Sequence, residues 1–135
     1  MQLTALLPVL LSTLSLTTAA PQGAPAVYKS NDLEIQGSPG GVAWRFDISA
    51  PKSENSPGFS THCQGVSSNV TLCADKNVTA QVRPLSDPNY NIWVQHHWAK
   101  MDGQYRQDFW QSGNVNVTKS TTRFQIKPDT FYGVA

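Results

Sequence analysis

Cys63 and Cys73 are the two cysteines of this sequence, and their chemistry is the most readily inferred from it. An even pair of cysteines in an exported chain normally forms one disulfide bond, and the N-terminal sequence described below indicates export. The bond would close a loop of about ten residues, for which the chain-entropy model gives about 2.7 kcal/mol of stabilisation. Two free thiols or an intermolecular disulfide are the alternatives. A metal site is disfavoured, because two thiols lack the further ligands that a zinc ion needs.

The adjacent histidines His96 and His97 are the residues that most resemble metal ligands or a catalytic base. Successive residues of a β-strand point to opposite faces, so the two imidazoles do not readily bind one ion. His62 is a third candidate, but two imidazoles do not make a catalytic zinc site. The pair therefore indicates a structural role in an aromatic strand, or groups that titrate in an acidic exterior. No metal or other cofactor is expected.

Carboxylates give no clear sign of hydrolysis. A glycosidase needs two carboxyl groups beside one bond, and Asp47 with Asp108 is a conceivable pair that nothing in the sequence favours over any other. The Gly-x-Ser-x-Gly pattern of a nucleophile elbow is absent from the sequence. We therefore expect that the protein is not an enzyme. A small secreted hydrolase is kept as the second of two alternative functions.

Tryptophans offer a candidate ligand surface. The sequence contains four of them: Trp44, Trp93, Trp98 and Trp110. Strand alternation places Trp93 and Trp110 on the face opposite to Ile92 and Val94, which in a two-layer domain faces water. A tryptophan there can stack on a sugar ring through its apolar surface. The alternative is that the two rings pack inside a closed barrel or stack as a cross-strand pair.

Three Asn-x-Thr sequons occur in the chain: they begin at Asn69, Asn77 and Asn116. Each alone is weak evidence, but three in an exported domain predict at least one N-linked glycan. A glycosylated asparagine must face solvent. If Asn77 faces outward, the alternating apolar residues Val78, Ala80 and Val82 point inward.

The N-terminal residues 1–19 are apolar and Leu-rich, too short to span a bilayer, and end in small residues. This is the pattern of a secretory signal peptide, and an uncleaved membrane anchor is the alternative. Cleavage after Ala19 is favoured over cleavage directly before Pro21. Residues 20–26 would then form a flexible lead, and residues 27–135 a single secreted, extracellular domain.

The charge balance excludes two classes of partner. Ten basic and nine acidic residues give a net charge of +1, with no block of one sign. The chain therefore lacks the electrostatic footprint of a nucleic-acid-binding protein and the basic stripe that binds anionic lipid. After cleavage about 115 residues remain, enough to bury one core. No membrane contact is expected after signal cleavage.

Alternation of apolar and polar residues predicts an all-β fold. Residues 42–49 and 90–100 alternate most clearly, and Asp102-Gly103 is a strong hairpin signal leading to a return strand at 105–111. Turn residues recur every eight to twelve positions, at about the spacing of a small antiparallel β-sandwich or β-barrel.

Further strands are expected from shorter patterns. They cover residues 27–36, 59–63, 70–73 and 77–83, followed by a turn at Ser112-Gly113 and a hairpin of residues 114–119 and 121–127. The disulfide would join the segments 59–63 and 70–73.

A signal-like N-terminus precedes a group of short motifs. These are Trp44-Arg-Phe-Asp-Ile-Ser49, Thr61-His-Cys63, Cys73-Ala-Asp75, the strand from Asn77 to Val82, and Tyr90-Asn-Ile-Trp-Val-Gln-His-His97. In this pattern, residues 42–113 resemble the fungal secreted proteins related to the major Alternaria allergen. The resemblance implies a compact extracellular β-barrel or sandwich without established catalytic machinery, and members of the family are implicated in host interaction.

The resemblance also carries one disulfide onto Cys63 and Cys73. The founding allergen's second disulfide and dimer-linking cysteine have no counterparts here, so a monomer or non-covalent dimer is expected. The sequence thus predicts a small secreted fungal effector- or allergen-like protein that binds a host protein or cell-wall polysaccharide. The alternative is a carbohydrate-binding wall module that uses Trp93 and Trp110.

Overall fold

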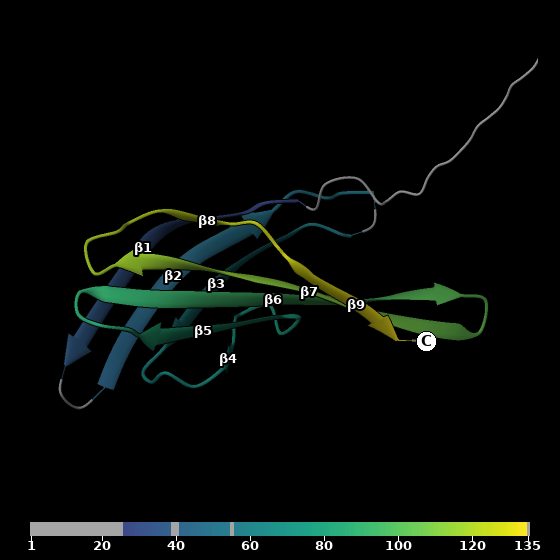
Figure 1. Ribbon diagram of the computed structural model, residues 1–135. Helices are drawn as coiled ribbons and strands as arrows, with labels where there is room; N and C mark the ends of the chain where they lie inside the picture. Colours follow the sequence, from purple (N-terminus) through teal and green to yellow (C-terminus); the bar gives the residue numbers. More distant parts are fainter. Residues whose placement is uncertain (1–25, 39–40, 55, 135) are drawn as a thin grey trace, which may run out of the picture.

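The computed structural model describes residues 26–38, 41–54 and 56–134 (Figure 1). The expected signal peptide, residues 1–19, and the expected lead up to residue 25 lie outside the described residues. Within the described ranges every regular element is a β-strand. None of these residues belongs to a helix long and apolar enough to cross a membrane.

Two antiparallel sheets pack face to face as a sandwich, so the all-β prediction is confirmed. Sheet I has the strand order β3-β2-β1-β8, and sheet II has the order β4-β5-β6-β7-β9. In chain order the strands are β1 (Tyr28–Ser38), β2 (Gly41–Ala50), β3 (Phe59–Gly65), β4 (Thr71–Leu72), β5 (Val78–Pro84), β6 (Asn89–Asp102), β7 (Tyr105–Thr118), β8 (Phe124–Ile126) and β9 (Thr130–Val134).

The core lies between the sheets and is built from alternate residues of each strand. On β2 every second residue from Val42 to Ala50 is buried and the residues between are exposed. This alternation arises because successive side chains of a strand point to opposite faces, and only one face meets the other sheet. The inward orientation predicted for β5 is confirmed, since Val78, Ala80 and Val82 are all fully buried.

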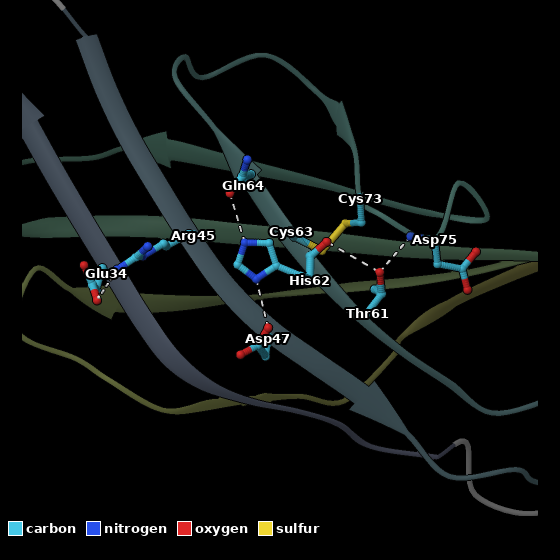
Figure 2. Close-up of polar contacts among 9 residues, drawn as sticks. All are labelled: Glu34, Arg45, Asp47, Thr61, His62, Cys63, Gln64, Cys73 and Asp75. Carbon is cyan, nitrogen blue, oxygen red and sulfur yellow. Dashed lines mark hydrogen bonds and ion pairs between the residues drawn. A yellow bond between two sulfur atoms is a disulfide. The ribbon is translucent and has the colours of Figure 1, made fainter.

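The disulfide between Cys63 and Cys73 is present and buried. Cys63 lies on β3, an edge strand of sheet I, and Cys73 follows β4, an edge strand of sheet II. The bond therefore joins the two sheets at one side of the sandwich. Beside it, the backbone N–H of Ala74 donates to the carbonyl of His62 at 2.8 Å. Figure 2 shows a second bond there, from the N–H of Asp75 to Thr61 Oγ1 at 2.7 Å.

The hairpin of β6 and β7 is the longest feature of the molecule. Its two strands have fourteen residues each, and Gly103 at the turn has a φ of 66°, which favours glycine. The predicted Asp-Gly turn is thus confirmed. Figure 1 shows this hairpin, in green, reaching well past the strands of sheet I, with β9 beside it.

The turn predicted at Ser112-Gly113 is wrong, because β7 passes through both residues without a break. Gly113 is instead a point of close approach between chain segments. A Cβ atom there would lie 2.7 Å from Ile126 Cγ2, 2.9 Å from the carbonyl oxygen of Lys127 and 3.0 Å from Pro128 Cα. The missing side chain lets the segment between β8 and β9 cross closely over β7.

The hairpin predicted from residues 114–119 and 121–127 is also wrong. Residues 114–118 belong to β7 in sheet II, whereas β8 lies in sheet I. There β8 pairs with β1, with Tyr28 opposite Ile126. The chain therefore changes sheets after β7, because the apolar residues of β8 complete the core beside β1.

Candidate functional site

A row of polar side chains crosses the outer face of sheet I (Figure 2). His62 on β3 lies opposite Asp47 on β2, with its Nδ1 2.9 Å from Asp47 Oδ1 and its Nε2 3.0 Å from Gln64 Oε1. Both ring nitrogens face oxygen acceptors, which suits the imidazolium form. The hydrogen bond to Asp47, followed by that to Gln64, raises the pKa of His62.

This His62–Asp47 pair has two of the three members of a hydrolytic triad. In a triad one ring nitrogen holds the carboxylate and the other faces the nucleophile. Here Gln64 occupies the second nitrogen, so no hydroxyl or thiol is placed for activation. The arrangement is that of an exposed cross-strand pair, as is the neighbouring Arg45–Glu34 ion pair at 2.9 Å.

The two adjacent histidines lie on opposite faces of sheet II, as predicted. His96 is buried in the interior, whereas His97 faces outward and places Nε2 2.8 Å from Asp108 Oδ1. His62 lies on the outer face of the other sheet and joins neither of them. Among the described residues no group of three His, Cys, Asp or Glu side chains could hold a metal ion.

The conceivable glycosidase pair is separated by the whole sandwich. Asp47 lies on the outer face of sheet I and Asp108 on the outer face of sheet II, so the two carboxyl groups cannot flank one bond. Hydrogen bonds from Arg106 and then His97 lower the pKa of Asp108, which keeps it ionised and unsuited to act as a general acid.

Trp110 is the centre of an aromatic row on the outer face of sheet II. The row consists of His97 on β6, Trp110 on β7 and Tyr132 on β9, which lie opposite one another. The ring centroids are 4.7 Å apart between His97 and Trp110 and 4.9 Å apart between Trp110 and Tyr132, with interplanar angles of 17° and 14°. Because β7 lies between the other two strands, both faces of the Trp110 ring are covered.

Trp93 lies on the same outward face but away from this aromatic row. It pairs with Asn114, four residues along β7 from Trp110, which corresponds to about 13 Å along the strand. The ring contacts within the described ranges do not include Trp93, and its side chain is half-buried. The two tryptophans of the candidate ligand surface therefore have different surroundings, one enclosed by rings and one not.

A second aromatic cluster lies on the inner face of sheet II, where the sheet extends past sheet I. It contains Trp98, Phe109 and Phe131, with centroids 5.7 Å apart between Trp98 and Phe109 and 6.0 Å apart between Phe109 and Phe131. Lys100 places Nζ 5.8 Å from the Phe109 centroid, within cation–π range. Trp98 is buried, but Phe131 is 46% exposed.

Exposed apolar side chains gather at one end of sheet II, on both of its faces, and this end is here called the tip surface. Of the nine large apolar side chains that are exposed within the described ranges, five lie there: Tyr105 and Phe131 on the inner face, and Met101, Tyr132 and Val134 on the outer face. Sequence reasoning did not find β9. Its run of Thr, Phe, Tyr and Val after Pro128-Asp129 is a strand-like composition and was the available signal.

The outer edge of β9 is open to pairing with another strand. Within the part of the chain that the structure describes, β9 pairs with β7 alone and forms the end of sheet II. Its five residues include no charged side chain and no proline, the usual devices that keep an edge strand from pairing with another chain.

A hollow of about 660 Å³ lies at the opposite end of the sandwich. Its described lining includes Gly37, Val42, Ser67, Asp87, Tyr90 and Lys119. Asp87 is the single carboxyl group of that lining, so the hollow does not offer the paired carboxylates that glycoside hydrolysis requires.

The burial of His96 predicts that the stability of the protein depends on pH. Burial lowers the pKa of His96, its ring lies between Phe59 and Trp98, and its Nδ1 atom is buried without a hydrogen-bond partner in the described structure. The folded state therefore resists protonation, whereas the unfolded state takes up a proton below pH about 6.5. Stability should fall as pH drops below this value, until the folded-state pKa is reached.

We expect the variant His96→Phe to lose this acid-dependent part of the stability, because phenylalanine fits between the same rings and does not titrate. Urea unfolding midpoints at neutral and mildly acidic pH measure the difference. His62 has a raised pKa and acts in the opposite direction, so His62→Gln is the matched control and should steepen the loss at low pH. An equal pH slope in wild type and His96→Phe would contradict the assignment.

Comparisons of this chain with protein-family models, curated proteins and solved structures find no match.

Proposed function

We propose that this chain is a secreted, non-catalytic binding protein of the fungal effector or allergen-like type, which engages a host protein through the tip surface. The observation that carries the proposal is the concentration of exposed aromatic and aliphatic side chains at this end of sheet II. Aromatic residues, methionine and arginine are enriched at protein interfaces. Tyr105, Tyr132 and Met101 give the tip surface this composition, and Arg106 lies opposite Met101.

The backbone of β9 adds a second means of recognition. An unpaired strand edge presents a row of N–H and C=O groups that an extended segment of a partner can bind by adding a strand. Phe131 and Tyr132 point to opposite faces of the sheet beside that edge. A partner strand would therefore find apolar contacts on both sides of its backbone.

A wall polysaccharide is the alternative ligand, and the ring geometry weighs against it at Trp110. Sugar binding by tryptophan uses the flat face of the ring, and both faces of Trp110 are already stacked against His97 and Tyr132. Trp93 has no such ring neighbour in the described structure. A ring face that no other ring covers is the observation that favours the polysaccharide alternative.

Export and glycosylation are part of the proposal. A buried disulfide supports an oxidising destination. The three sequon asparagines, Asn69, Asn77 and Asn116, are all exposed, as glycan acceptors must be.

The tip surface is tested by charge substitution. We expect the double variant Tyr105→Lys, Phe131→Lys to lower affinity for a protein captured from host extracts by at least about tenfold, because two desolvated aromatic contacts would be replaced by hydrated ammonium groups. Capture with immobilised wild type, followed by titration of the recovered protein, measures the change.

The matched control is Val66→Lys, an apolar side chain that is 85% exposed and lies away from the tip surface. It should bind as wild type does. Equal affinity of all three proteins would refute the tip surface as the binding site. Retention on insoluble chitin, glucan or cellulose that Trp93→Ala abolishes would favour the polysaccharide alternative.

A further inference from the structure

Asn91 is a buried amide at the centre of a polar network on the outer face of sheet II. Arg83 donates from Nη2 to Asn91 Oδ1 at 2.6 Å. Asn91 Nδ2 donates in turn to Asn114 Oδ1 at 3.0 Å and to Asn116 Oδ1 at 2.9 Å. A guanidinium can only donate, so Arg83 fixes which end of the Asn91 amide faces it, and the other end must meet oxygen atoms.

The donation from Arg83 to Asn91, and from Asn91 onward, determines the orientation of the Asn116 amide. Its Oδ1 is held by Asn91, and the Asn116 Nδ2 atom takes no part in the network. Asn116 is exposed and begins the sequon completed by Thr118. Glycosylation joins a sugar to Nδ2 and leaves Oδ1 as an acceptor, so the network is compatible with an occupied sequon.

The same geometry places an indole ring beside the acceptor. Asn116 lies opposite Asn91, and Trp93 lies opposite Asn114, so Trp93 and Asn116 are diagonal neighbours on one face. Diagonal pairs on adjacent strands are about 7–8 Å apart, which a sugar attached to one side chain can bridge. Trp93, unlike Trp110, has no aromatic neighbour among the ring contacts of the described residues.

We propose that Asn116 carries an N-linked glycan whose first N-acetylglucosamine rests on the indole ring of Trp93. The proposal depends on the export included in the proposed function. The donor is a lipid-pyrophosphate-linked oligosaccharide: the bond from the anomeric carbon to the phosphate oxygen breaks, the bond from that carbon to Asn116 Nδ2 forms, and the amide proton leaves. The apolar face of the sugar then covers the ring.

The glycan and the tip surface would occupy separate regions. Asn116 lies six residues along β7 from Trp110, which corresponds to about 20 Å. Trp93 is then an internal support for the glycan, and removal of the glycan should leave partner capture through the tip surface unchanged.

The test uses the full chain secreted from yeast with Asn69→Gln and Asn77→Gln, so that Asn116 is the remaining acceptor. Mass spectrometry measures its occupancy. Thermal unfolding is then compared for untreated protein, protein trimmed by an endoglycosidase that leaves one N-acetylglucosamine, and protein stripped by an amidase that leaves aspartate. We expect trimming to have no effect and stripping to lower Tm by about 2–5 °C.

The matched variant is Trp93→Leu in the same background. In this variant, removal of the glycan should change Tm only through the aspartate that the amidase leaves. That aspartate is present in both stripped proteins. In the trimmed protein that retains Trp93, NMR should show the N-acetylglucosamine protons shifted upfield by the indole ring, a readout that does not require the Trp93→Leu variant to fold.

Three results of this experiment would contradict the proposal or a part of it. A secreted chain with Asn116 bare overturns this inference alone. An occupied Asn116 with equal losses of Tm in both proteins, or without the upfield shift, overturns the contact with Trp93. A chain retained in the cytosol overturns the export on which this inference and the proposed function both depend.

Discussion

The double variant Cys63→Ala, Cys73→Ala is expected to lose about 2–4 kcal/mol of its free energy of unfolding. The two cysteines are ten residues apart, and the chain-entropy model gives a loop of that length about 2.7 kcal/mol. Both side chains are buried, so truncation also removes packing contacts. Urea denaturation followed by tryptophan fluorescence measures the loss.

Reduced wild-type protein should unfold at nearly the same urea concentration as this double variant, because both lack the covalent link between sheet I and sheet II. Lys76→Ala, an exposed position just after Cys73, is the matched control and should leave the midpoint unchanged. A wild-type midpoint that does not respond to reductant would contradict the prediction.

Phe46→Ala is expected to cost about 3–5 kcal/mol, the range found when a buried aromatic ring is deleted. Phe46 is fully buried on β2 and contacts two further rings, with centroids 5.6 Å from Trp44 and 5.2 Å from Phe124. Phe124 belongs to β8, so the lost ring also supports the strand that closes sheet I. The same urea titration, combined with near-UV circular dichroism, measures the effect.

Arg45→Ala is the neighbouring control, since Arg45 lies on the outer face and its ion pair with Glu34 is open to solvent. Exposed pairs of this kind contribute little to stability. Phe46→Leu should fall between wild type and the alanine variant. A Phe46→Ala protein as stable as Arg45→Ala would show that the core does not depend on this ring.

The parts of the fold that could be predicted from the sequence are those determined by residues close together in the chain. The alternation in β2 was readable because one face of the strand is buried and the other is wet along its whole length. The β6–β7 turn was readable because Asp102-Gly103 is a chemical signature of a hairpin. In both cases the deciding interactions lie within a few residues of one another.

The wrong predictions concern places where contacts between segments far apart in the sequence determine the structure. Ser112-Gly113 looks like a turn in isolation, yet Gly113 is required by the approach of Ile126 and the backbone after it. No local rule distinguishes a glycine needed for a turn from one needed for close packing. The partner of β8 was equally hidden, because its three residues give too short a pattern to assign a sheet.

The candidate site shows the same division. A period of two was sufficient to place His96 and His97 on opposite faces and Trp93 and Trp110 on one face. It did not give the stacking of Trp110, which depends on Tyr132 of β9. The sequence of that strand, Thr-Phe-Tyr-Gly-Val, lacks the alternation of apolar and polar residues by which the clearest strands were recognised.

The pairing of β1 with β8 has a consequence for biosynthesis. Tyr28 is among the first described residues to leave the ribosome and Ile126 is among the last, yet the two lie opposite each other in sheet I. The nascent chain cannot complete sheet I until β8 has been synthesised. Until then the edge of β1 and the core residues beneath β8 stay uncovered, which makes holdase chaperones most useful to the chain during elongation.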